Sequence, residues 1–191
     1  MDKRLHGCMM LAYRAHEGQK RKYSGIPYIA HPAELFFRFC GWVDSKERPE
    51  FDGDWILILK CAAWLHDVKE DCPQITDDQI MEAAGSLAIP VLAVVNWLTN
   101  PSKGTKLPRA ERKRMDREHL AKAPADIKVL KALDRIINLR DMKGSGDDGF
   151  IELYAEESVL LLSALQMPPS LNDIAPELGE ELSFWCKEVS R

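Results

Sequence analysis

The stretch that most constrains the fold is an apolar run, residues 55–65, that ends directly in a cluster of ionisable side chains. A helix that is apolar on nearly every side is buried all round, so this one should be central. Charge buried at its end costs several kcal/mol unless it is paired or bound to a cation. The cluster comprises His66, Asp67, Glu70 and Asp71. It therefore favours a metal ion, the alternative being a helix end that surfaces into a solvated loop.

The spacing inside this cluster places several of its members side by side if the helix continues through it. Residues three and four apart share a helix face, so Asp67 would neighbour Glu70 and Asp71. His66 would neighbour Glu70 in the same way. One side of the helix would then present an imidazole and a carboxylate, with two more carboxylates a turn further on.

Length and composition indicate one domain spanning residues 1–191. The chain is 46% hydrophobic and 29% charged, as expected of a globular protein. Its net charge of −4 argues against a nucleic-acid partner. The five cysteines lack metal-finger spacing and are expected to be reduced. No apolar run reaches the ~18 residues of a membrane span, and the N-terminus is unlike a signal peptide, so we expect a cytoplasmic protein without a membrane partner. The oligomeric state is left open.

Helical periodicity recurs along the chain and predicts an all-α bundle of about eight to nine helices. Thr76 and Gln79 form a capping-box pattern that should open a short helix ending at Gly85. Val159 is expected to face inward on the helix 150–165, which follows a turn at 144–149. The predicted helices cover residues 3–17, 31–43, 55–71, 76–84, 87–98, 109–122, 125–140, 150–165 and 173–189.

Three further features outside the apolar run suggest a binding site. The glycine-containing loop 17–32 carries three consecutive cations at 20–22, which are either phosphate contacts or simply solvated. His31 lies at a helix entry, as a structural residue or a ligand. Asp134 shares an apolar face with Leu130 and Ile137, and an acid in that position calls for a cation.

Four segments in order resemble the HD-domain hydrolases of the RelA/SpoT family, in particular the small stand-alone alarmone hydrolases of the metazoan SpoT-homologue type. They are AHEGQKRKYSGIPYIAHP (15–32), AAWLHDVKED (62–71), LTNPSKGTKLPRAERKR (98–114) and LDRIINLRDM (133–142). The resemblance implies an HD-fold helical bundle with one divalent metal, usually Mn²⁺. The ligands it implies are His31, His66, Asp67 and Asp134. Such a nitrogen and oxygen set also suits Fe²⁺, Co²⁺ or Zn²⁺.

The resemblance also assigns roles to residues around the metal. Glu70 and Asp71 match a pair that positions or deprotonates the attacking water. The matched substrate contacts are Arg21, Lys22, Ser24, Asn138 and Tyr154. The chain departs from the family pattern at Lys69, at Leu133 and at Phe150, where small members often carry a phosphate-binding arginine. Arg109 or Arg112 on the basic helix is expected to compensate for that arginine.

The resemblance leads to three hypotheses of function. The first is a metal-dependent guanosine-3′,5′-bis(diphosphate) 3′-pyrophosphohydrolase that converts (p)ppGpp into GDP or GTP and pyrophosphate. The second is the same class of chemistry on another phosphorylated nucleotide, such as removal of the 2′-phosphate of NADPH, which Phe150 keeps open. The third is a non-catalytic module that senses such nucleotides.

Overall fold

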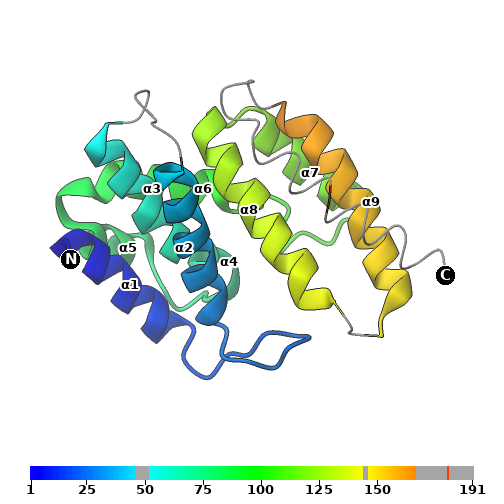
Figure 1. Cartoon of the computed structure of the whole chain (residues 1–191), viewed down its shortest axis with the longest axis horizontal. Coiled ribbons are helices and arrows are strands. Elements are labelled where there is room, and N and C mark those ends of the chain that lie inside the picture. Colours follow the sequence, from blue (N-terminus) through cyan, green and yellow to red (C-terminus); the bar gives the residue numbers. More distant parts are fainter. Residues whose placement is uncertain (46–51, 144–145, 167–179, 181–191) are drawn as a thin grey trace. The chain divides into compact units, whose positions relative to one another are not determined.

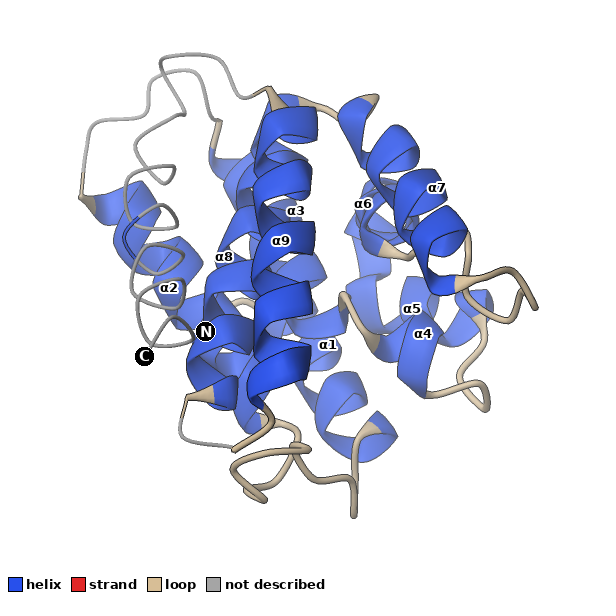
Figure 2. Ribbon diagram, turned by 90° about the vertical axis from the view of Figure 1, so that its right-hand side faces the viewer, coloured by secondary structure: helices blue, strands red, loops and turns tan. Residues whose placement is uncertain are grey.

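The structure is a computed structural model that describes residues 1–45, 52–143, 146–166 and Glu180. Every regular element within these residues is a helix, and Figure 2 shows helices joined by loops. The predicted all-α class is confirmed. The predicted last helix, 173–189, lies outside the described residues apart from Glu180, and so does the middle of the predicted loop 44–54.

The chain divides into two compact units. Unit 1 comprises Met1–Arg21 and Ile26–Thr99, and unit 2 comprises Lys22–Gly25 and Asn100–Arg191. The single domain expected over residues 1–191 stays a prediction.

Unit 1 is organised around α3, which packs against α1, α2 and α6 (Figure 1). Its residues from Ile58 onward are buried except Lys60, as the apolar run predicts. Asp52 caps the helix by accepting a hydrogen bond from the Trp55 amide. The elements of unit 1 are α1 (Lys3–Ala15), α2 (Ala30–Asp44), α3 (Gly53–Leu65), α4 (Val68–Asp71), α5 (Asp77–Ala84), the 3-10 helix η1 (Gly85–Leu87) and α6 (Ala88–Leu98).

The α5–α6 stretch shows how local sequence sets helix limits. Thr76 and Gln79 form both hydrogen bonds of the predicted capping box, and Gly85 ends α5 with a φ of 57°. The whole stretch Asp77–Leu98 is long and apolar enough, by length and composition, to cross a membrane. Here it forms α5, η1 and α6, and α5 and α6 pack against each other.

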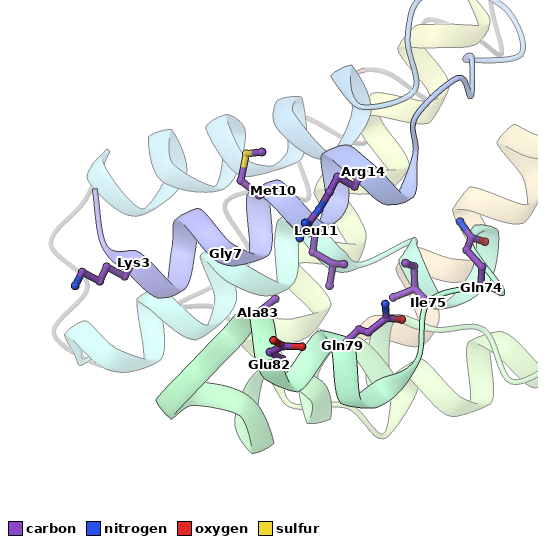
Figure 3. Close-up of a pocket in the computed structure, with 10 residues that line it drawn as sticks. All are labelled: Lys3, Gly7, Met10, Leu11, Arg14, Gln74, Ile75, Gln79, Glu82 and Ala83. Atoms are coloured by element: carbon purple, nitrogen blue, oxygen red, sulfur yellow. The ribbon is translucent and has the colours of Figure 1, made fainter.

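The crossing of α1 and α5 depends on a glycine. A Cβ atom on Gly7 would lie 2.3 Å from the Ala83 carbonyl oxygen, so the two backbones approach as only glycine allows. Figure 3 shows Gly7 and Ala83 facing each other beside a surface pocket of about 670 Å³. Lys3, Arg14 and Glu82 at this pocket are exposed side chains.

Unit 2 consists of α7 (Arg109–Ala121), α8 (Ala125–Met142) and α9 (Asp148–Leu165), with α9 packed on both α7 and α8 (Figure 1). The predicted turn 144–149 extends too far toward the C-terminus, because α9 already begins at Asp148. The inward position predicted for Val159 is wrong, since this side chain is 48% exposed. Glu157 and Ser158 are buried in its place because both bind arginines.

Candidate metal centre

Three potential ligand atoms converge in unit 1. His31 comes from the first turn of α2, while His66 and Asp67 lie between α3 and α4. His31 Nε2 and His66 Nε2 are 3.1 Å apart. Asp67 Oδ2 lies 3.2 Å from His31 Nε2 and 2.9 Å from His66 Nε2. Atoms that share one ion at ~2.1 Å lie ~3 Å from one another, so these separations fit a common cation.

The break between α3 and α4 produces this convergence. The sequence allowed one helix through the motif, but α3 ends at Leu65 and α4 begins at Val68. The amides of Glu70 and Asp71 then donate to the Asp67 carbonyl oxygen, at 3.0 and 2.9 Å, and start the short helix α4. Val68 is fully buried and anchors that turn.

A backbone hydrogen bond selects the ring nitrogen of His66 that could bind a metal. His66 Nδ1 lies 2.9 Å from the Ala63 carbonyl oxygen, an acceptor, so Nδ1 carries the proton. Nε2 faces His31 and Asp67 and is the nitrogen that can offer a lone pair to a metal once it has no proton. A backbone carbonyl that orients an imidazole in this way is typical of metal-binding histidines.

The electrostatics keep Asp67 ionised. Burial raises the pKa of this carboxyl, but the neighbouring His66 and His31 outweigh it and hold the pKa well below its usual range. Both histidines are only 2% exposed. An ionised carboxylate between two buried imidazoles is the donor set expected of a divalent transition-metal site.

The sequence reasoning missed Tyr28 in this cluster. The Tyr28 hydroxyl donates to Asp67 Oδ2 at 2.6 Å, and its oxygen lies 3.2 Å from Asp71 Oδ2. Its place three residues before His31, in the sequence PYIAHP, was the available signal. Asp67 and Asp71 are thus neighbours, as their spacing predicted.

Lys69, a departure from the family pattern, is directed to α5 and α6. Its Nζ lies 2.7 Å from both Asp77 Oδ1 and Asn96 Oδ1. These contacts fix α4, which carries the half-buried Glu70 and the exposed Asp71. The roles of Glu70 and Asp71 in catalysis stay predictions.

Asp134 is buried in unit 2 with polar partners on its own helix, α8. Asn138 Nδ2 donates to its Oδ1 at 2.7 Å, and Lys131 Nζ lies 2.9 Å from its Oδ2. Asp134 is 4% exposed. Lys131 is therefore a cation beside the acid that the sequence argument did not foresee, and the metal-ligand role of Asp134 stays a prediction.

Phe150 lies among cations of unit 2. Lys22 Nζ is 4.9 Å from the centre of its ring and Arg109 Cζ is 5.1 Å from it, within the range of cation–π attraction. Arg109 also makes a bidentate ion pair with Glu157, with N–O distances of 2.7 and 2.9 Å. Phe150 thus carries no charge itself but packs against two cationic side chains.

The remaining predicted substrate contacts are spread over both units and stay predictions. In unit 1, Arg21 Cζ lies 5.8 Å from the ring centre of Tyr28. In unit 2, Ser24 is exposed in its loop, Arg112 is half-buried on α7, and the buried ring of Tyr154 lies 3.6 Å from Arg135 Cζ.

Comparison with known proteins decides the family. No protein-family model matches the sequence. The human guanosine-3′,5′-bis(diphosphate) 3′-pyrophosphohydrolase MESH1 is 31% identical over 181 residues, which cover 93% of this chain and 89% of MESH1. The chain belongs to the MESH1 and SpoT family of hydrolases. The resemblance seen in the sequence is confirmed.

A second relative agrees with this family, and a solved structure agrees with the fold. The bifunctional (p)ppGpp synthase/hydrolase SpoT of Escherichia coli is 33% identical over 188 residues, which are 95% of this chain but only 24% of SpoT. A solved structure of a metazoan SpoT orthologue, reported to hydrolyse ppGpp and to act in starvation responses, matches with a TM-score of 0.74. It is 22% identical and covers 95% of this chain, so it supports the fold alone.

Proposed function

We propose that this member of the MESH1 and SpoT family is a metal-dependent (p)ppGpp 3′-pyrophosphohydrolase, an enzyme of alarmone breakdown. The observation that carries the proposal is the convergence of His31 Nε2, His66 Nε2 and Asp67 Oδ2 within 3.2 Å of one another. Human MESH1, named as such a hydrolase, supports the choice of substrate. We propose Mn²⁺ as the ion and Asp134 as the fourth ligand, on the strength of the sequence resemblance.

The chemistry divides between the ion and the side chains. When bound, a divalent ion supplies Lewis acidity, which lowers the pKa of water and offsets phosphate charge. Glu70 and Asp71 lie at the end of α4, the short helix that follows His66 and Asp67, and can accept the proton of the attacking water. Attack of this water on the phosphorus joined to the 3′ oxygen forms a new P–O bond and breaks the bond to the 3′ oxygen. The 3′ oxygen takes up a proton, and the products are pyrophosphate and GDP or GTP.

The substrate-binding role falls to the cations of the 17–32 loop and α7. Lys22 is exposed and carries a charge that a phosphate can approach. Arg109 pairs with Glu157 through Nε and Nη2, which uses two of the five N–H donors of its guanidinium group. We propose that Arg21 and Lys22 bind phosphate together with Arg109.

A second candidate substrate is NADPH, with removal of its 2′-phosphate. Phe150 favours keeping this candidate. An aromatic ring cannot bind a phosphate as the family's arginine does, so the lost arginine changes how a second phosphate is held beside Lys22 and Arg109. A ring in this place also offers a surface on which a second nucleobase could stack.

The test is turnover of the Mn²⁺-loaded protein on ppGpp, pppGpp and NADPH, with the products separated by ion-exchange chromatography. We expect pyrophosphate from ppGpp at a kcat/KM at least tenfold above that for NADPH, a difference of ~1.4 kcal/mol in barrier. A larger kcat/KM on NADPH, with release of inorganic phosphate, would support the second candidate. Metal-loaded protein that releases neither product would overturn both.

A further inference from the structure

Tyr28 joins two carboxylates that the proposed mechanism uses for different tasks. Its hydroxyl donates to Asp67 Oδ2 at 2.6 Å, the short distance of a charge-assisted O–H···O⁻ bond. The same oxygen lies 3.2 Å from Asp71 Oδ2, so the one proton is shared, mainly toward Asp67. A phenol therefore connects a proposed metal ligand to a proposed proton acceptor.

The ring of Tyr28 is fixed from several sides within unit 1. It stacks on the buried imidazole of His16, with ring centres 4.7 Å apart and planes inclined at 29°. It also meets the ring of His31 edge-on at 5.7 Å. The Tyr28 amide donates to the Gln19 carbonyl oxygen at 2.9 Å. The hydroxyl thus has little freedom to turn away from the carboxylates.

The loop that carries Tyr28 is tied to the end of α4 by Gln19. Its side-chain nitrogen donates to the Asp71 carbonyl oxygen at 3.2 Å and to Cys72 Sγ at 3.6 Å. Its side-chain oxygen lies 2.8 Å from His16 Nδ1, which thereby acts as a donor. The same network that holds the Tyr28 ring therefore holds the backbone of Asp71.

We propose that Tyr28 is a positioning residue that sets the direction of Asp67 toward the metal and of Asp71 toward the attacking water. The inference rests on the proposed function. Two carboxylates four residues apart repel each other, and a donor between them fixes their separation at the lowest electrostatic cost. Partners of this kind, one step behind a metal ligand, commonly change metal affinity or activity 10–100-fold.

The experiment compares Tyr28→Phe with Tyr13→Phe, a phenol on α1 that is 55% exposed. Mn²⁺ affinity of the metal-free protein is measured by calorimetry, and kcat and KM for ppGpp by pyrophosphate release. We expect Tyr28→Phe to weaken Mn²⁺ binding about tenfold and to lower kcat about 10–100-fold, with KM changed less than twofold. Tyr13→Phe should match the wild type in all three quantities.

The outcomes separate this inference from the proposed function. If the wild type hydrolyses ppGpp and Tyr28→Phe keeps its Mn²⁺ affinity and kcat, positioning by Tyr28 is wrong and the function stands. If the wild type binds Mn²⁺ but does not hydrolyse ppGpp, the function fails. Weaker Mn²⁺ binding by Tyr28→Phe would still support the positioning role in that case. A rise in KM alone would assign Tyr28 to substrate binding and overturn the inference.

Discussion

At the scale of single residues, the sequence pointed to side chains that the structure brings together, while their chemical roles stay predictions. His66 and Asp67 were identified because charge at the end of an apolar helix needs a partner, and both contact His31. Tyr28 was missed because a tyrosine in a loop has many ordinary roles, and only the fold brings it to Asp67. Lys131 was missed because a lysine three residues before an acid reads as a surface ion pair.

Glu70 separates an enzyme from a nucleotide-sensing module. Glu70→Gln keeps the shape of the side chain but removes its ability to accept a proton. We expect kcat for ppGpp to fall by ~10²–10⁴-fold while Mn²⁺ and nucleotide affinities stay within a few-fold. Stopped assays with radiolabelled ppGpp would measure kcat, and calorimetry both affinities. The exposed Glu82→Gln is the matched control. Unchanged turnover in Glu70→Gln would remove this residue from the mechanism.

At the scale of elements, periodicity predicted most helices, and the errors arise where polar contacts compete with it. The helix over 55–71 is interrupted at His66 and Asp67, because those side chains meet His31 on α2. On α9 the apolar pattern predicted that Val159 faces inward. Ser158 is buried instead, because its hydroxyl oxygen accepts a hydrogen bond from Arg135 Nε at 2.6 Å. Such pairings join distant segments and leave no local pattern.

The α1–α5 crossing predicts a penalty for a single methyl group. Gly7→Ala should lower the free energy of unfolding by ~1–3 kcal/mol, because the new Cβ would meet a backbone oxygen that cannot turn aside. Gly41→Ala is the control, since nothing lies within 4 Å of its Cβ position in α2. Gly41→Ala should raise the free energy of unfolding by ~0.5–1 kcal/mol, because alanine has the higher helix propensity. Equal effects of the two changes in urea titrations would contradict a close crossing.

The contact between α7 and α9 is predicted to depend on Glu157. Glu157→Gln would leave Arg109 and the buried Arg135 without their anionic partner, at side-chain distances of 2.7 and 3.8 Å. We expect a loss of ~1–3 kcal/mol, below the value for a fully buried pair because the Arg109 side chain is 36% exposed. Thermal unfolding should show it. The neighbouring exposed Glu156→Gln should leave stability within ~0.5 kcal/mol.

At the scale of the whole molecule, the family follows from ordered motifs more firmly than from any one of them. The sequence alone placed the chain among small alarmone hydrolases, and the 31% identity to human MESH1 confirms the family. The substrate could not be predicted to the same degree, because Phe150 departs from the family pattern and its contacts with Lys22 and Arg109 come from distant parts of the chain. Those contacts appear only in the folded chain.

Metal binding should stabilise the folded chain as a whole. Mn²⁺ at 100 times its Kd should raise the free energy of unfolding by ~2.7 kcal/mol, since the unfolded chain lacks the preformed site. For a chain of this size the Tm should rise by ~5–10 °C. Differential scanning fluorimetry with Mn²⁺, and with a chelator, would measure the shift. Ca²⁺, which prefers all-oxygen sites, is the control and should shift the Tm much less.

The most direct test of the metal centre is a Mn²⁺ titration of metal-free protein followed by electron paramagnetic resonance. We expect one Mn²⁺ per chain in the wild type. Binding should weaken at least tenfold in His31→Ala, His66→Ala, Asp67→Asn and Asp134→Asn, and stay unchanged in the exposed-histidine control His6→Ala. Wild-type protein that binds no Mn²⁺, or His66→Ala protein that binds it as tightly as wild type, would contradict the account.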